Sequence, residues 1–365
     1  MRFPEFTEEW ETKPINDLAV VIGGGTPDTT VKSYLDGKIQ WFTPSEIGKT
    51  KYVDSSLRTI TEDGLNNSSA KRLPPNTILL SSRATIGECS LSLRECATNQ
   101  GFQSLVSKKC NVDFLYYLIQ TKKNDLIRKS CGSTFLEISA NEVRKIQVSI
   151  PSDVEQQKIA GLLSLIDERI ATQNKIIERL ETLIKGIRNE IFWKLRKNVG
   201  FNAIIGDVLD YEPPQSYIVE DTEYIDKGTP VLTANKAFIL GYTSETEGIY
   251  DKGDCIIFDD FTLDSKYVDF PFKVKSSAIK ILTAENKELL RYTFEFLKYL
   301  DLSTSEHKRH YIAETQNQEF ILPTTQIVRT IAHTFSILSL RMETAIKQRL
   351  LFEKQKQYLL RQMFI

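Results

Sequence analysis

One segment occurs twice in this chain, 172 residues apart. Ile150-Pro151 precedes EQQKIAGLLSLIDERI, and Leu322-Pro323 precedes TQIVRTIAHTFSILSLRM, so the two prolines align at this offset. Similar residues then recur in pairs: Ile159 with Ile331, Ala160 with Ala332, Ser164 with Ser336, Arg169 with Arg341, Ile170 with Met342, and Phe192 with Phe364. A repeat of this length predicts two copies of one unit, each large enough for a core of its own.

Each repeated segment is predicted to be a long helix, because a proline ends the strand before it and no proline interrupts it. From 159 to 191, the residues that step by four and three read Ile, Leu, Ile, Ile, Gln, Ile, Leu, Ile, Ile, Ile. This 3.5-residue period is typical of a coiled-coil seam. Gln173 interrupts the seam, either as a polar residue that fixes the register or as a residue at an exposed edge.

The second helix carries a less regular seam. Arg349 and Lys356 occupy seam positions, so this seam is looser or shifted locally toward Leu350 and Leu351. A helix of roughly 40 residues is about 60 Å long. If the two seams pack on each other, the helices run antiparallel and an approximate two-fold axis relates the two halves.

The globular parts are predicted to mix strands and helices. Apolar runs at 18–22, 39–43, 77–82 and 146–150 indicate strands, and 112–130 indicates a helix. The second half repeats this order with strands at 231–235 and 255–262 and a helix at 285–300. The expected fold is α+β, with two similar domains at 1–150 and 199–323 and spacer helices at 151–198 and 324–365.

Charge is nearly balanced over the whole chain but unevenly distributed along it. Residues 326–365 carry 7 basic and 2 acidic side chains, whereas residues 200–325 carry 12 basic and 22 acidic ones. That acidity counts against a nucleic-acid partner for the second domain unless its acids lie on a face turned away from the ligand. Without a signal peptide or an apolar run of about 18 residues, the chain is expected to be cytoplasmic.

Motifs for catalysis and cofactors are weak or missing. The five cysteines lack C-x-x-C spacing, so free buried thiols are expected. TPSEIGKT at 43–50 has Thr43 where a phosphate-binding loop needs its first glycine, and Gly23-Gly24-Gly25 lacks the spacing of a dinucleotide site, which favours a tight turn or a flexible loop. Neither Pro-Pro pair fits an amino-methylating enzyme that uses AdoMet, and the three histidines form no convincing metal cluster. A binding protein is therefore favoured over an enzyme.

The order of variable domain, EQQKIAGLLSLIDERI helix, second domain and second helix resembles the DNA-specificity subunit of type I restriction-modification enzymes. The likeness covers essentially the whole chain. NTILLSSRATIGECSL and ATNQGFQSL in the first domain resemble the family pattern of a strand ending in Ser-Arg-x-Thr-Ile-Gly and an Asn-Gln pair before the next strand. The second domain departs from this pattern with Asp259-Asp260-Phe261-Thr262.

The resemblance implies a non-catalytic reader of double-stranded DNA. Each domain would recognise one half of a split, asymmetric target, and the helices would set the spacing and dock two methylation subunits. Restriction subunits, which are ATP-dependent translocases and nucleases, would join the complex. We expect no cofactor on this chain, because AdoMet, ATP and magnesium would belong to the partner subunits, and we expect no membrane partner.

Polar residues at strand ends are the predicted DNA contacts in both domains. Arg83 suits guanine and Asn99 or Gln100 suits adenine, although the Asn-Gln-Gly and Ser-Arg-Ala-Thr segments have structural roles as alternatives. Asp260 either accepts from a cytosine amine or is a solvated loop acid. The first-domain set is Thr43, Ser45, Ser82, Arg83, Thr85, Asn99 and Gln100, with Lys49 and Lys51 for phosphates. The second-domain set is Thr233, Asn235, Lys236, Asp260, Thr262, Lys275 and Ser276, with Lys308, Arg309 and Tyr311 for the backbone.

Two other classes stay open on the sequence alone. One is a protein-interaction scaffold with two adaptor domains on a coiled-coil arm, and the other is a nuclease. Salt-dependent binding to duplex DNA distinguishes a reader from a scaffold, and metal-dependent cutting would reveal a nuclease.

Overall fold

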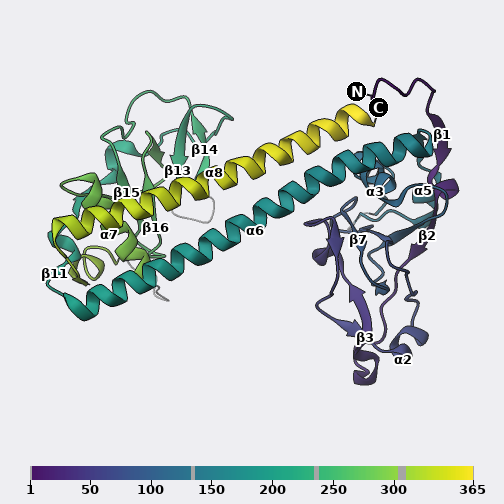
Figure 1. The fold of residues 1–365 in the computed structure, drawn as a ribbon, viewed down its shortest axis with the longest axis horizontal. Helices are drawn as coiled ribbons and strands as arrows, with labels where there is room; N and C mark the ends of the chain where they lie inside the picture. The colour runs from purple at the N-terminus through teal and green to yellow at the C-terminus, as the bar shows by residue number, and fades with distance from the viewer. Residues whose placement is uncertain (1, 133–135, 234–237, 303–309, 365) are drawn as a thin grey trace. The chain divides into compact units, whose positions relative to one another are not determined.

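The computed structural model describes residues 2–132, 136–233, 238–302 and 310–364, and the chain divides into two compact units. The first unit comprises Met1–Lys175 together with Lys347–Ile365, and the second comprises Ile176–Ile346. Each unit contains β-sheets and part of both long helices, α6 (Asp153–Asn198) and α8 (Thr325–Met363), drawn in teal and yellow in Figure 1. The predicted α+β class with two long helices is confirmed.

The first unit has a five-stranded sheet of order β2-β9-β6-β7-β4 and a three-stranded sheet of order β5-β3-β8, while β1 pairs with β10. The strands are β1 (Glu11–Pro14), β2 (Ala19–Gly23), β3 (Leu35–Phe42), β4 (Tyr52–Val53), β5 (Thr59–Ile60), β6 (Ile78–Leu80), β7 (Cys89–Ser92), β8 (Cys96–Thr98), β9 (Gln103–Ser107) and β10 (Gln147–Ile150). The four strands predicted for this half correspond to β2, β3, β6 and β10.

Short helices cover the sheets of the first unit. They are α1 (Ile15–Leu18), α2 (Glu62–Asn66), α3 (Val112–Thr121), α4 (Lys123–Arg128) and α5 (Ala140–Lys145), with 3-10 turns η1 (Lys32–Tyr34) and η2 (Pro44–Glu46). Asn111 caps α3 by accepting a hydrogen bond from the Phe114 amide at 3.0 Å. The predicted helix over 112–130 is two helices, because Lys122 leaves helical geometry at ψ 9°. Residues 114–119 of α3 are buried against the sheet and the long helices.

The second unit repeats this plan with other strand lengths. A four-stranded sheet has the order β12-β18-β15-β16, a three-stranded sheet has the order β14-β13-β17, and β11 pairs with β19. Its elements are β11 (Ala203–Ile204), η3 (Ile205–Asp207), β12 (Asp210–Glu212), η4 (Pro214–Tyr217), β13 (Thr229–Leu232), β14 (Ile239–Thr243), β15 (Cys255–Asp259), β16 (Ser265–Val268), β17 (Lys273–Val274), β18 (Ile279–Thr283), α7 (Lys287–Leu300), η5 (Thr315–Asn317) and β19 (Glu319–Phe320). The predicted strands and the helix of this half correspond to β13, β15 and α7.

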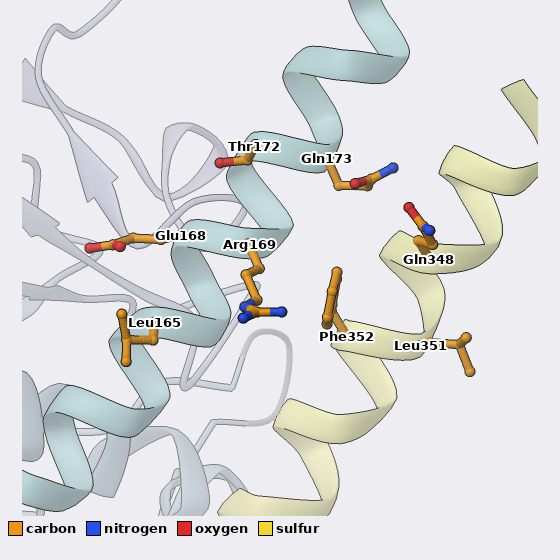
Figure 2. Close-up of a pocket in the computed structure, with 8 residues that line it drawn as sticks. All are labelled: Leu165, Glu168, Arg169, Thr172, Gln173, Gln348, Leu351 and Phe352. Atoms are coloured by element: carbon orange, nitrogen blue, oxygen red, sulfur yellow. The ribbon is translucent and has the colours of Figure 1, made fainter. Parts of the chain in front are cut away.

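The helical seams are buried within each unit. In the first unit, Ile159, Leu163 and Ile166 of α6 share a core with Leu359 and Met363 of α8. This pairing is antiparallel, because the N-terminal part of α6 meets the C-terminal part of α8. Gln173 is only 7% exposed, so it lies within the seam and not at an exposed edge. Figure 2 shows Phe352 of α8 beside Arg169 of α6, whose guanidinium lies 5.7 Å from the ring centre.

A phenylalanine near the C-terminal end of each long helix packs on a helix of the other repeat, which is α7 for Phe192 and α3 for Phe364. Phe192 of α6 is fully buried among Tyr292, Phe296 and Tyr299 of α7. Its counterpart Phe364, which follows α8, lies 5.2 Å from Phe114 of α3 between ring centres. The match at the 172-residue offset therefore marks two equivalent packing sites.

Among the described residues, no helix combines the length and the apolar character that a membrane span requires.

Candidate nucleic-acid interface

In the first unit, two parallel strands end side by side and present polar loops. Strands β3 and β8 pair with Phe42 opposite Thr98, and the Asn99 amide continues the ladder by donating to the Phe42 carbonyl at 3.1 Å. Thr43 and Asn99 therefore follow the two strands as neighbours. The Glu46 carboxylate holds the first loop, because it accepts from the Thr43 amide at 2.7 Å and from the Thr43 hydroxyl at 2.6 Å. Ser45 is left exposed at the tip of η2.

The Gly23-Gly24-Gly25 segment packs against the backbone of the loop that contains Asn99 and Gln100. Gly24 has no room for a side chain, because a Cβ built there would lie 1.9 Å from the Asn99 carbonyl oxygen. The Gly25 amide donates to the Thr98 carbonyl at 2.8 Å, and the Thr26 hydroxyl donates to the Gln100 side-chain oxygen. Close backbone contact, and not a flexible loop, is thus the structural reason for these glycines.

The predicted segment after β6, which contains Ser82, Arg83 and Thr85, lies next to the ends of β3 and β8. The Ser82 amide donates to the Gly101 carbonyl at 2.8 Å, which brings the segment after β6 next to the Asn99 loop. Ser82 itself is buried, whereas Thr85 is exposed and Arg83 is partly exposed. The Arg83 guanidinium pairs with the Glu137 carboxylate at 2.7 Å. An anionic or base ligand at Arg83 would have to compete with this partly exposed pair.

The two lysines predicted to contact phosphates differ in position. Lys49 is exposed. The Lys51 side chain is only 6% exposed, and its ammonium lies 2.6 Å from the Asp113 carboxylate and 2.7 Å from the Ser164 hydroxyl. This burial corrects the prediction for Lys51, which holds the interior of the unit together.

The second unit repeats the strand-end geometry. Strands β13 and β17 are parallel with Leu232 opposite Val274, and the Lys275 amide donates to the Leu232 carbonyl at 2.9 Å. Thr233 and Lys275 therefore correspond to Thr43 and Asn99. Lys275 and Ser276 are exposed, and the Lys275 ammonium lies 5.7 Å from the Tyr224 ring centre. Tyr224 was not predicted from the sequence, because only the tertiary structure brings it to this loop.

Asp260 and Tyr311 are interior residues, which corrects both predictions. Asp260 is 1% exposed and accepts from the main-chain amides of His310 and Tyr311 at 3.0 Å and 2.8 Å. Lys280 completes the site at 3.2 Å from the Asp260 carboxylate. A carboxylate with this many buried partners organises the loop and is not a solvated acid. The Tyr311 side chain is 1% exposed and packs on Phe258.

The loop after β15 is shorter than its counterpart after β6. The Asp259 amide donates to the Asp264 carbonyl, whereas the Ser81 amide donates to the Glu88 carbonyl. Asp259 also accepts from the amides of Phe261 and Thr262, which fixes the tight turn. Thr262 is exposed, and so is Phe261 at the place that Arg83 takes in the first unit. The predicted contacts Asn235, Lys236, Lys308 and Arg309 lie outside the described residues.

The side chains at these strand ends can form hydrogen bonds and carry charge, and the described residues offer little else for catalysis. Burial raises the pKa of the thiols of Cys89, Cys96 and Cys255 to about 12, so they stay protonated near neutral pH and are poor nucleophiles. In the described part of the chain, no three His, Cys, Asp or Glu side chains come together as metal ligands. The exposed groups are those that suit base edges and phosphates.

Comparison of the sequence with known proteins finds DNA specificity subunits among its relatives. Residues 7–182 match the family described as "Type I restriction modification DNA specificity domain". The MjaIX specificity subunit of Methanocaldococcus jannaschii is 35% identical over 218 residues, which is 58% of this chain and 50% of that protein. The EcoR124I/EcoR124II specificity subunit of Escherichia coli is 42% identical over 151 residues, or 40% of this chain and 35% of that protein. The chain thus matches half or less of these relatives' length.

Solved structures share the fold over nearly the whole chain. The type I restriction-modification S subunit from M. genitalium has a TM-score of 0.66 at 15% identity, covering 100% of this chain and 99% of that one. A second structure, from work on complex assembly and conformational transition of the type I R-M system, has a TM-score of 0.54 at 14% identity and covers 99% of this chain and 98% of that one. At these identities the likeness concerns the fold alone.

Proposed function

We propose that the chain is the non-catalytic DNA reader of a type I restriction-modification complex and recognises an asymmetric target in two parts, because residues 7–182 match the DNA specificity domain of that family and specificity subunits are among its relatives. One observation carries this proposal. The same pair of parallel strand ends occurs in both units, with Asn99 following one pair and Lys275 following the other. Equivalent positions with different side chains suit two half-sites of different sequence.

In the first unit, the proposed base contacts are the exposed or partly exposed residues of the three converging loops. Arg83 can present two donors to guanine once Glu137 is displaced, and the Asn99 amide group suits adenine. Thr43, Ser45, Thr85 and Gln100 line the same edge, and Lys49 contacts phosphate. In the second unit, the corresponding contacts are Thr233, Thr262, Lys275 and Ser276, together with Asn235, Lys236, Lys308 and Arg309.

The long helices are proposed to set the half-site spacing and to dock partner subunits. Leu165 of α6 and Ile337 of α8 are equivalent at the 172-residue offset, and both are exposed, at 59% and 42%. Leu165 and Leu351 are among the residues that line a pocket formed by α6 and α8 (Figure 2). This repeated exposed apolar position supports two similar docking surfaces for two methylation subunits. Restriction subunits would join this complex, and AdoMet, ATP and magnesium would act on the partners.

Selection from a random duplex pool tests the proposal with the full-length chain. We expect enrichment of two short, different sequences separated by a fixed number of unspecified base pairs. Binding should weaken steeply as salt rises, since phosphate contacts release counterions. Absence of salt-dependent DNA binding would favour the scaffold, and metal-dependent cutting by the isolated chain would favour a nuclease.

A further inference from the structure

Partly buried polar residues join the first globular domain to both long helices. The Lys51 ammonium bridges Asp113 of α3 and Ser164 of α6, and it lies 4.9 Å from the Tyr117 ring centre. Asp113 and Ser164 are separated by 51 residues of sequence, so this lysine connects parts of the unit that are distant along the chain. We call the network formed by Lys51, Asp113, Tyr117, Ser164, Asp167 and Lys356 the first seat.

Asp167 of α6 is the centre of the first seat. Its Oδ2 accepts from the Tyr117 hydroxyl of α3 at 2.6 Å, and its Oδ1 lies 2.8 Å from the Lys356 ammonium of α8. Burial and the neighbouring Asp167 raise the pKa of Tyr117, which keeps this hydroxyl a donor. One carboxylate thereby fixes three helices of the unit to one another.

The second unit has a comparable network built from other residues. Glu295 of α7 is 1% exposed and pairs with Arg188 of α6 at 2.7 Å and with Arg291 at 2.8 Å. Arg291 also donates to the Ser339 hydroxyl of α8. Ser339 occupies the repeat position of Asp167, because the two differ by 172 residues. We call Arg188, Arg291, Glu295 and Ser339 the second seat.

Buried ionic groups of this kind add little net stability, because desolvation offsets most of the attraction. They do restrict geometry, since each charge is satisfied in only one arrangement of its partners. Two such networks occur where a domain helix meets both long helices, and they use different residues. The two networks occupy equivalent places in the two units but are built from different residues. This indicates that each network serves to maintain the orientation of its domain.

We propose that each seat holds its recognition domain in one fixed orientation on the helix pair, and that the Asp167–Lys356 pair thereby makes the protein selective for one spacing between its two DNA half-sites. This inference rests on the proposed function. Adding one base pair moves a half-site by about 3.4 Å and rotates it by about 35°. A rigidly seated domain cannot follow that change, whereas a loosely seated one can.

The test uses the full-length chain and the split duplex that it selects, with half-sites unchanged and the spacer varied one base pair at a time. The triple variant Tyr117→Phe/Asp167→Leu/Lys356→Met replaces the central charges by apolar groups. We expect it to fold, to keep its base preferences, and to lose about tenfold or more of its discrimination between the best spacer and its neighbours. Tyr117→Phe alone removes one hydroxyl and should lose a smaller part of this discrimination.

A matched control lies on the same helix. Glu190 and Lys194 of α6 form an exposed pair at 2.5 Å, so Glu190→Gln/Lys194→Met should leave spacer discrimination unchanged. A folded triple variant that discriminates as sharply as the wild type overturns the inference, as does a wild type with no preferred spacing. If the triple variant does not fold, unchanged discrimination in Tyr117→Phe overturns it. A wild type that selects no split sequence contradicts the proposed function instead.

Discussion

Replacing Gly24 by alanine should distort the Asn99–Gln100 loop of the first unit, which we propose contacts DNA, through a steric clash whose size follows from the structure. The added Cβ would lie 1.9 Å from the Asn99 carbonyl oxygen and 2.6 Å from the Thr98 carbonyl oxygen. Ordinary van der Waals contact begins at 3.4 Å, so the Asn99 backbone has to withdraw by about 1.5 Å. The two carbonyl oxygens are main-chain atoms, which cannot rotate away as the Thr98 hydroxyl, 2.4 Å from the added Cβ, can.

Overpacking of this kind typically costs about 1–3 kcal/mol of unfolding free energy. For a unit of this size, each kcal/mol lowers the Tm by about 2–4 °C. Because Asn99 and Gln100 move with the strain, discrimination at the half-site that we propose for the first unit should also fall by about 1–3 kcal/mol, which is the contribution of one good bidentate base contact. The half-site read by the second unit should keep its preference.

Thermal unfolding and duplex selection on the same samples measure both effects. Gly186 of α6 is the matched control, because it is exposed and a Cβ there would meet no atom within 4 Å. Gly186→Ala should stabilise the protein by up to about 1 kcal/mol through helix propensity. Wild-type stability and unchanged base preference in Gly24→Ala would refute the reasoning.

Three further substitutions or insertions test other parts of the account. Arg83→Ala should cost about 1–3 kcal/mol on the selected target and relax preference at one base position, whereas equal weakening on all sequences would assign Arg83 to phosphate. Glu295→Ala should cost about 3–5 kcal/mol of unfolding free energy, because it leaves the Arg188 charge without its buried partner, and calorimetry showing a loss below 1 kcal/mol would contradict this. Four residues inserted after Gln173 should lengthen α6 by about 6 Å and increase the preferred gap between half-sites, and an unchanged gap with binding retained would show that the helices do not set it.

Local signals were sufficient for the two long helices and for four of the ten strands of the first unit. The proline after each strand and the 3.5-residue apolar period predicted the two long helices, and short apolar runs predicted β2, β3, β6 and β10. The equivalence of Thr43 and Thr233, each of which follows a corresponding strand, was also predicted from the parallel order of the two halves. These predictions succeed because strand and helix periods are properties of neighbouring residues.

Burial of polar side chains was not predictable from the same signals. Lys51 stands in a polar loop, yet its partner Ser164 is 113 residues away. Asp260 is satisfied by the amides of His310 and Tyr311, about 50 residues later in the chain. Charged residues are usually exposed unless a partner is supplied, and only the tertiary structure shows that partner.

The irregular second seam has a specific explanation. Lys356 was interpreted as a sign of looser or shifted packing, but its side chain is 14% exposed and lies against Asp167. The charge of Lys356 therefore marks an ion pair with the other helix, whereas Arg349 pairs with Glu353 within α8 at 3.6 Å. The sequence could have indicated this only through knowledge of which residues face each other across the seam.

Exchange of one domain tests the central claim most directly. Residues 1–150 are replaced by the corresponding domain of a relative with a different target, and the sequences bound by the chimera and the parent are compared. We expect one half of the split target to change while the other half stays the same. A simultaneous change of both halves would contradict the separation of reading between the two units.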